Sequence, residues 1–287
     1  MVMVDSGAAA ASDRVLTAVR QIHQTLRPPE MPESASPFGN TWQATHAFPD
    51  PMIRMIINTS SNADHVGGNA NIRMSPLFRL LGYRDPSLSL QVLAHAAVQR
   101  RMVESKAPNL LVPTDTYLSG TYTLYRCFNN QAVQIFHMPR AVTDGDSVVW
   151  FRRSDAIAAG DVYNSDIYPP IDVDKGGSIN GEIDALDTLI GMSVTEFMSQ
   201  GGTMIVPGHG WISDAADVGN YRDMLTVIRD RIQAMVDKGM TLAQVSATAQ
   251  QWGDRVIITD VANLTIKHPL FQQACQLVSL HLPETLE

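Results

Sequence analysis

The sequence predicts an α/β sandwich whose functional site lies along one edge of its sheets. Short apolar segments that suit strands alternate with longer segments of helical periodicity. Polar residues able to bind metals follow directly after three of the apolar segments, at residues 58–69, 160–161 and 207–210. Layers of strands and helices would bury the apolar faces of both and leave the strand ends open for a site.

Composition favours a globular protein that acts on a small molecule. The chain has 287 residues, of which 45% are hydrophobic and 17% are charged, enough to bury a sizeable core without disulfide bonds. Its net charge is −8, whereas nucleic acids and anionic membranes select for basic patches. We therefore predict a small-molecule substrate, no nucleic-acid partner and no membrane partner.

Cysteines and apolar runs give no sign of a disulfide framework or an anchor. Cys127 and Cys275 stand far apart without a Cys-x-x-Cys spacing, so both are expected to be buried thiols. No apolar run approaches the roughly 20 residues of a membrane span. Residues 1–7 lack the basic region and cleavage site of a signal peptide. We expect a soluble protein, and its compartment is unknown from the sequence.

The first fifty residues predict a strand, a helix and a long loop. Residues 1–4 are an apolar strand, and residues 8–26 carry apolar side chains at helical spacing. Residues 27–51 contain six prolines and no clear period, which is typical of a surface loop. Trp42 and Phe48 in this loop would either cover the site as a lid or anchor the loop to the body.

The remaining elements alternate as an α/β fold requires. We predict strands at residues 52–57, 122–128, 132–138, 147–152, 156–159 and 204–206, with a tight turn at 129–130. We predict helices at residues 87–105, 178–189, 215–238, 242–250 and 270–280. Within the first of these helices, His95 is expected to be a packing or surface residue rather than a ligand.

The most informative segment is residues 57–69, in which Asp64-His65-Val-Gly-Gly follows an apolar strand. It resembles a motif of the metallo-β-lactamase superfamily, whose members carry His-x-His-x-Asp-His-x-Gly-Gly at this place. Asp64 and His65 match the motif, while Ser60 and Asn62 stand where its first two histidines belong. The resemblance extends from residue 2 to about residue 240, and it implies the four-layer αββα arrangement of two mixed sheets covered by helices.

The resemblance also bears on domain organisation and on the beginning of the chain. It predicts one metallo-β-lactamase-like domain over residues 1–250, with residues 251–287 as a C-terminal helical tail packed on the same domain. Members of the superfamily have several strands before the one that residues 1–4 resemble, so the chain is expected to lack these leading strands. An exposed sheet edge would follow, with self-association through it as a plausible consequence.

The metal ligands of the superfamily come from five loops and usually hold two ions. The third-motif histidine is replaced by Val142, so the three histidines of the first metal site are all absent. Asp64, His65, Asp161 and His209 match the residues that surround the second metal. The resemblance therefore implies at most one ion, Zn²⁺ or less tightly Mn²⁺ or Fe²⁺, with the alternative that none binds.

Ordinary structural roles remain open for the same residues. Asp64 and His65 could pair with each other, Asp161 could accept backbone N–H bonds, and His209 could be a satisfied histidine in a glycine turn. Arg140, beside the site, could pair with Asp64 or Asp161 if no metal is present.

Other polar residues near the third motif have ordinary interpretations too. His137 resembles a strand residue of the superfamily rather than a substitute ligand. Asp144 and Asp146 follow Thr143 in a turn, where acceptance of backbone N–H bonds is the usual role.

The predicted function is hydrolysis of an ester, a thioester or a lactam with at most one metal, and Asp64 is the predicted proton acceptor. Residues 167–178, together with residues 143–146, are similar to a bacterial subgroup of zinc hydrolases of the quinoprotein-relay type. The alternative is a catalytically inactive protein of the same fold that acts as a binding module. A third reading is a chain whose missing leading strands prevent stable folding.

Overall fold

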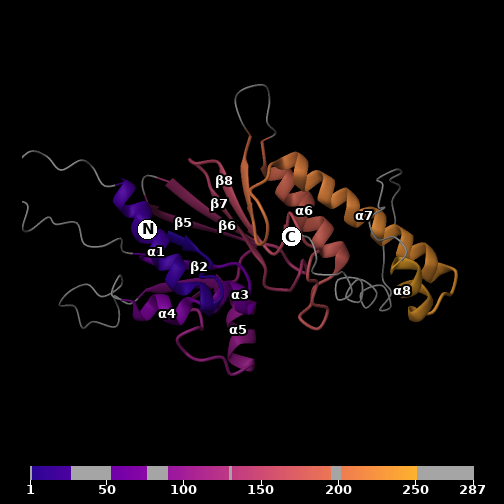
Figure 1. Ribbon diagram of the computed structural model, residues 1–287, viewed down its shortest axis with the longest axis horizontal. Coiled ribbons are helices and arrows are strands. Elements are labelled where there is room, and N and C mark those ends of the chain that lie inside the picture. The colour runs from indigo at the N-terminus through magenta and orange to yellow at the C-terminus, as the bar shows by residue number, and fades with distance from the viewer. Residues whose placement is uncertain (1, 27–52, 76–89, 129–130, 195–201, 251–287) are drawn as a thin grey trace, which may run out of the picture.

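The computed structural model describes residues 2–26, 53–75, 90–128, 131–194 and 202–250 (Figure 1). Its strands are β1 (Val2–Val4), β2 (Met55–Asn58), β3 (Gln91–His95), β4 (Asp115–Tyr117), β5 (Thr121–Phe128), β6 (Gln131–His137), β7 (Ser147–Phe151), β8 (Ala156–Gly160) and β9 (Met204–Pro207). Its helices are the 3₁₀ helix η1 (Ala9–Ala11) and α1 (Ser12–Leu26), α3 (Ala63–Val66), α4 (Asn69–Met74), α5 (Ala96–Glu104), α6 (Ile179–Met192), α7 (Ala215–Asp237) and α8 (Leu242–Gln250).

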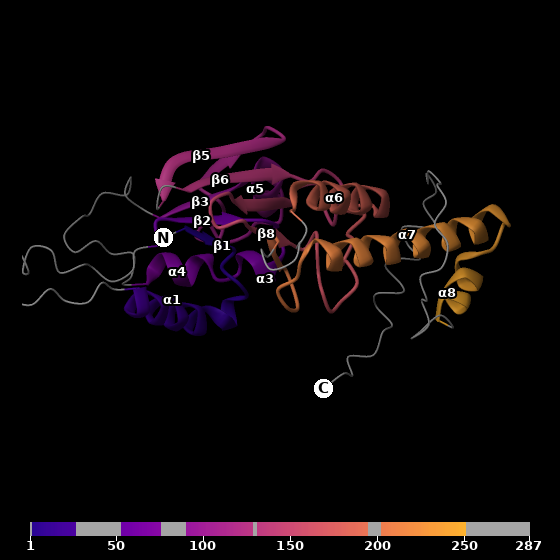
Figure 2. The ribbon, with the colours of Figure 1, turned by 90° about the horizontal axis from the view of Figure 1, so that it is seen from above.

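The strands form two sheets, as the sequence predicts. The first sheet has the order β1-β2-β3-β4, and all its pairs are parallel. The second has the order β5-β6-β7-β8-β9, in which β8 and β9 are parallel and the other pairs are antiparallel. Figure 2 shows α1 and α4 on one side of the first sheet, with β5 and β6 on its other side. The predicted α/β sandwich of two sheets covered by helices is confirmed.

Alternating side chains divide the first sheet between two cores. Ile56 and Val92 point to one face, where they pack with Leu16 of α1. Their chain neighbours Ile57 and Leu93 point to the other face and pack against the second sheet. This period of two is what a strand buried on both faces requires. The first sheet is therefore an interior layer of the sandwich.

The second sheet buries its other face under two helices. Val148 and Ile157 pack in one cluster with Leu186 of α6 and Val218 of α7, and Figure 1 shows these helices side by side. Ser178 caps the start of α6 by accepting a hydrogen bond from the Gly181 N–H. The two helices close the fourth layer.

Helix α6 approaches the chain between β6 and β7 very closely. The Ser178 N–H donates to the carbonyl oxygens of Arg140 and Ala141 at 3.0 Å. A Cβ at Gly181 would overlap the Arg140 carbonyl oxygen, and one at Gly177 would overlap that of Val142. Glycine is needed at both positions because a side chain would force the helix away from this segment.

One predicted helix is partly wrong. Residues 91–95 of the predicted helix 87–105 form strand β3, and the helix begins at Ala96. Val92, Leu93 and Ala94 are all buried, and β3 pairs with β2 on one side and β4 on the other. Burial between two parallel strands overrides the helical preference of this stretch.

Two short helices and one strand were not predicted. The segment after β2 contains α3 and α4, which are not among the helices that the sequence predicts. Strand β4 is three residues long, and two of these are exposed, so it lacks an apolar pattern.

Other predictions fall outside the described residues. They are the loop 27–51 with Trp42 and Phe48, the turn at 129–130, Cys275, the helix 270–280 and the tail 251–287. The side chain of Cys127 on β5 is also outside them, so the buried thiols stay a prediction. The division of the chain at residue 250 stays a prediction as well.

Strand β1 lies at the end of the first sheet and, among the described strands, pairs with β2 alone. The predicted sheet edge is therefore present in the described part of the chain, and self-association through it stays a prediction. Among the helices that the structure describes, none combines the length and the apolar composition needed to cross a membrane.

Gly181→Ala and Gly191→Ala are a matched pair on helix α6, because a Cβ would overlap a carbonyl oxygen at Gly181 and would meet nothing within 4 Å at Gly191. Gly181→Ala is expected to lower the free energy of unfolding by about 1 to 3 kcal/mol. Gly191→Ala is expected to raise it by up to about 1 kcal/mol, through helix propensity. Urea unfolding followed by circular dichroism measures both, and equal effects would contradict the close approach of α6.

Candidate metal centre

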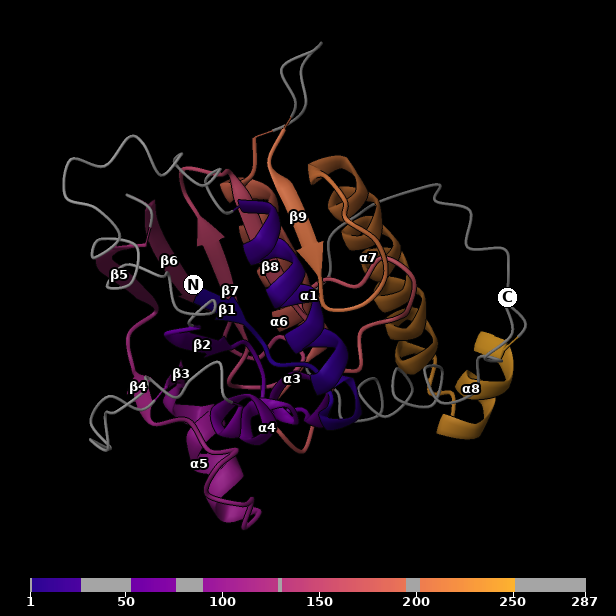
Figure 3. The ribbon, with the colours of Figure 1, turned by 60° about the vertical axis from the view of Figure 1, so that its left-hand side comes forward.

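The site lies where strands of both sheets end. Strands β1 and β2 are parallel, so Asp5 and Thr59, which follow them, lie at the same edge of the first sheet. Strands β8 and β9 are also parallel, and Asp161 and His209 come shortly after their ends. In Figure 3, the arrowhead of β9 points toward α3, which carries His65. Four strand ends thus deliver polar side chains to one place.

His65 is buried between two carboxylates. Its Nδ1 lies 2.7 Å from Asp5 Oδ2, and its Nε2 lies 3.0 Å from Asp161 Oδ1. Asp5 is held in turn by Thr59, whose backbone N–H donates to Asp5 Oδ1 at 2.8 Å. A histidine that donates Nδ1–H to a carboxylate has its tautomer fixed, with Nε2 directed at the next group.

The two carboxylates determine the charge of His65. Burial works against the charged imidazolium, but Asp5 and Asp161 outweigh it and raise the pKa of His65 to about 11. Burial alone would also raise the pKa of Asp161, yet the neighbouring His65 and the amide of Asn62 hold that pKa below its usual value. Without a metal, His65 is therefore an imidazolium beside the ionised Asp161 carboxylate.

Asp161 points one carboxylate oxygen at two imidazole nitrogens. The carboxylate is 1% exposed, and its Oδ2 accepts a hydrogen bond from Asn62 Nδ2 at 2.8 Å. Its Oδ1 forms an ion pair with His65 Nε2 at 3.0 Å and lies 3.7 Å from His209 Nε2. Apart from these imidazoles, no donor among the described residues contacts Oδ1, so a metal ion that displaced the proton of His65 would keep this oxygen paired.

Asp64 and His209 complete the cluster on its open side. Asp64 Oδ2 lies 3.0 Å from His209 Nε2, and both side chains are more than one-third exposed. One ligand atom from each of Asp64, His65, Asp161 and His209 lies within 4.8 Å of all the others. Two imidazole nitrogens and two carboxylate oxygens suit Zn²⁺. The structure therefore brings all four sequence-predicted residues together.

A buried asparagine joins the two loops that carry Asp161 and His209. Asn164 is fully buried, and its Nδ2 donates to the Asp161 carbonyl oxygen at 3.1 Å. Its Oδ1 accepts a hydrogen bond from the His209 N–H at 2.9 Å. Asn164 thereby fixes the spacing of two candidate ligands that lie far apart in the sequence.

Comparisons with known proteins identify the architecture. No family model matches the chain, and no curated protein matches its sequence. A metallo-β-lactamase from Pontibacter korlensis is 14% identical, with a TM-score of 0.52 over 78% of this chain and 81% of that chain. The DIM-1 metallo-β-lactamase exposed to ceftazidime is 14% identical, with a TM-score of 0.51 over 78% of each chain.

A stereoselective inverting sec-alkylsulfatase from Pseudomonas sp. is also similar. It is 12% identical, with a TM-score of 0.58, over 97% of this chain and 45% of that chain. The chain has the metallo-β-lactamase fold. At such identities the likeness establishes the fold, and function must be argued from the site.

Three residues are predicted, from the sequence resemblance alone, to stand in place of the histidines of a first metal site. We call Ser60, Asn62 and Val142 the replaced positions. Ser60 is buried and its Oγ accepts a hydrogen bond from the Asn62 N–H, while Val142 is fully buried and apolar. Asn62 donates to Asp161, so one replaced position supports the remaining centre.

Two further residues near the third motif lie apart from the centre. His137 stacks on His95 with ring centroids 3.6 Å apart, and its Nε2 contacts the Asp144 carbonyl oxygen at 2.8 Å. Arg140 makes no ion pair with any described carboxylate; the contacts of Asp64 and Asp161 are made by histidines and Asn62 instead. The expectation that Arg140 pairs with one of these carboxylates in the absence of a metal is therefore wrong.

Asp5 and Asn164 were missed by the sequence analysis. Asp5 directly follows the first apolar strand, which is where a short acidic side chain can reach a site. Asn164 comes three residues after Asp161, the spacing at which a side-chain amide bonds back to a loop backbone. Neither position predicts a site residue by itself, because whether Asp5 and Asn164 reach the site depends on which strands pair.

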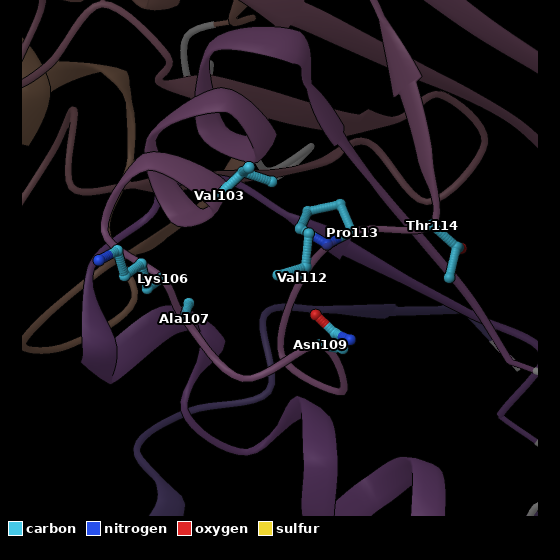
Figure 4. Close-up of a pocket in the computed structure, with 7 residues that line it drawn as sticks. All are labelled: Val103, Lys106, Ala107, Asn109, Val112, Pro113 and Thr114. Carbon is cyan, nitrogen blue, oxygen red and sulfur yellow. The ribbon is translucent and has the colours of Figure 1, made fainter.

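A cavity of about 450 Å³ lies elsewhere, between the end of α5 and the segment that leads to β4 (Figure 4). It is lined by Val103, Lys106, Ala107, Asn109, Val112, Pro113 and Thr114. None of these residues is a histidine or a carboxylate, so the cavity lacks the groups of the metal centre.

Asp5→Asn is expected to weaken zinc binding by about 10-fold to 100-fold, because the uncharged amide no longer fixes the His65 ring or increases its basicity. Competition with a chromophoric chelator measures the affinity. Asp184→Asn is the matched control, since Asp184 is exposed on α6. Equal zinc affinity in the Asp5 variant and the control would contradict a role for Asp5.

Zinc binding is expected to release one proton from His65. The pKa of His65 is about 11 without a metal, so the ring is protonated near neutral pH and must lose a proton to become a ligand. The apparent zinc affinity should therefore fall about tenfold for each pH unit of acidification in the neutral range. Calorimetry in buffers of different ionisation enthalpy counts the protons, and a binding heat independent of the buffer would rule this out.

Proposed function

We propose that the chain is a metal-dependent hydrolase of a small molecule that uses one metal ion, held by Asp64, His65, Asp161 and His209. The observation that supports this most directly is the convergence of one ligand atom from each of these residues within 4.8 Å, with the buried Asp161 Oδ1 directed at two imidazole nitrogens. Two imidazoles and two carboxylates gathered in this way are usual ligands of Zn²⁺. Substrates with an ester, thioester or lactam bond suit the proposal.

The four residues fit zinc by number and chemistry. Zinc takes nitrogen and oxygen ligands, commonly four, and a fourth position held loosely leaves room for substrate or water. When bound, the metal supplies Lewis acidity toward a substrate oxygen and increases the acidity of a water. His65 and Asp161 are buried and firmly held, so they are the structural part of this ligand set.

Asp64 is the residue best placed to handle a proton. Its side chain is 45% exposed and contacts His209, so it lies on the side of the cluster that solutes can reach. A carboxylate there accepts a proton from water as the attack proceeds and returns it to the leaving group. Asp64 is more exposed than Asp161, so it would be the more readily available of the two carboxylates for proton transfer if a metal were bound.

Exposed apolar residues beside the centre favour a substrate with an apolar part. Trp211 and Ile212 come two and three residues after His209 and are 63% and 60% exposed, and Ile167 is 44% exposed. The Trp211 N–H donates to Ser165 Oγ, which ties this segment to the loop after β8. Exposed apolar groups at the rim of a site commonly contact ligands.

An inactive binding module is the second candidate, and one observation favours it. The carboxylates already have imidazole partners without a metal, since Asp5 and Asp161 flank His65 and Asp64 lies 3.0 Å from His209. All three replaced positions also lack metal ligands. In this case the protein would bind a small molecule without turnover.

Variants of the two aspartates test the hydrolase directly. Zinc-loaded protein is expected to hydrolyse at least one substrate in a panel of aryl esters, thioesters and lactams. Asp161→Ala is expected to lose both zinc and turnover. Asp64→Asn is expected to keep zinc, measured by elemental analysis, and to lose about 10² to 10⁴ in kcat, because it cannot accept a proton.

Asp166→Asn is the matched control, because Asp166 is exposed on the neighbouring loop. Turnover that persists in both Asp64→Asn and Asp161→Ala would contradict the assignment. Zinc binding without turnover of any substrate in the panel would favour the binding module.

A further inference from the structure

We propose that the ammonium of Lys175 lies at the replaced positions and binds a negatively charged oxygen group of the substrate, a carboxylate, sulfate or phosphate. That the bound anion is part of a substrate rests on the proposed hydrolase. Binding of an anion by Lys175 does not depend on hydrolysis. A metal ion at the first site would bring positive charge to this place, and in this chain the lysine brings it instead.

The backbone holds Lys175 against the replaced position Val142. The Asp172 N–H donates to the Val142 carbonyl oxygen at 2.8 Å, and the Asp144 N–H donates to the Lys175 carbonyl oxygen at 2.9 Å. Gly177 lies so close to Val142 that a Cβ would overlap the Val142 carbonyl oxygen. The loop 172–177 is therefore packed directly on the segment that contains Val142.

The side chain of Lys175 extends from there to the replaced position Asn62. Lys175 Nζ lies 3.4 Å from Asn62 Oδ1, while Asn62 Nδ2 donates to Asp161 Oδ2 at 2.8 Å. The amide is oriented consistently, with its oxygen toward the ammonium and its nitrogen toward the carboxylate. A single side chain therefore separates the ammonium from a candidate metal ligand.

The ammonium can take a further partner. Its other contact is an ion pair with Asp172 Oδ2 at 2.9 Å. An ammonium has three N–H donors, and the two contacts use two of them. The Lys175 side chain is 40% exposed, so solutes can reach it. An oxyanion would accept a charge-assisted hydrogen bond from the third N–H of the ammonium.

Neighbouring arginines keep Asp172 and Asp144 from making this corner negative. Arg100 and Arg101 both pair with Asp144, and Arg101 also donates to the Lys175 carbonyl oxygen. The three cations Arg100, Arg101 and Lys175 thus accompany the three carboxylates Asp144, Asp172 and Asp174. Of the three cations, Lys175 has the ammonium that contacts the replaced position Asn62.

These contacts, with the apolar residues near His209, define a substrate class. The hydrolysed bond lies at the centre, an apolar part contacts Trp211 and Ile212, and an oxyanion group contacts Lys175. A small amphiphilic anion with an ester, thioester or lactam bond has these features.

Binding of benzoate and its neutral analogue benzamide to metal-free protein tests the anion site without any turnover. Benzoate is expected to bind about tenfold more tightly than benzamide, as a charge-assisted hydrogen bond at a partly exposed site allows. Lys175→Met should abolish this preference, and Lys175→Arg should retain most of it. Lys238→Met, at an exposed lysine after α7, is the matched control and should bind as the unaltered protein does. Titration followed by NMR chemical shifts measures all four.

An unchanged benzoate preference in Lys175→Met, or the absence of any preference in the unaltered protein, would overturn the proposal. A loss of the preference in Lys238→Met would overturn it too, because the effect would then be one of net charge.

Zinc content and ester hydrolysis separate this proposal from the hydrolase. Lys175→Met should bind as much zinc as the unaltered protein, because Lys175 is not a ligand. If esters are hydrolysed, the ratio of kcat/KM for the 4-nitrophenyl monoester of succinate to that for 4-nitrophenyl butyrate should fall about tenfold in Lys175→Met. If no ester is hydrolysed, the proposed hydrolase function is contradicted. The preference for benzoate over benzamide then still tests whether Lys175 binds anions.

Discussion

The contact of His65 with Asp5 and Asp161 is the interaction on which the rest of the site depends. It joins the end of β1, helix α3 and the end of β8, three segments that are distant in the sequence. Since a buried imidazolium needs both carboxylates, and the carboxylates need it, the three groups fix one another's positions. Asn164 then sets the His209 loop relative to Asp161. The centre is thus prepared by the fold rather than assembled by a ligand.

The surroundings of Asp161 show why it is the ionised carboxylate. Burial raises the pKa of Asp146 to about 7, and burial raises that of Glu182 well above its usual value. Asp161 is buried nearly as deeply, yet its pKa is lowered because His65 lies beside it. Both Glu182 oxygens lack hydrogen-bond partners, as a neutral side chain tolerates better than a charged one. The negative charge of the buried carboxylates is thereby concentrated on Asp161, at the candidate metal centre.

Much of the fold and all four candidate ligands could be predicted from the sequence, because short motifs at strand ends fix both. Asp64 and His65 stand in one motif, while Asp161 and His209 are each marked by a neighbouring glycine. The sequence predicts a helix where β3 lies, because these five residues carry no turn signal and the strand depends on pairing with β2 and β4. The contacts of Asp5 and Lys175 could not be predicted, since they depend on strand order and loop packing.

The central claim is that this fold holds one metal ion, among Asp64, His65, Asp161 and His209. Anomalous diffraction at the zinc absorption edge, from crystals grown with zinc, tests it most directly. A single peak between these four side chains is expected, and none in Asp161→Ala. A second peak beside the replaced positions, or no peak in the unaltered protein, would contradict it.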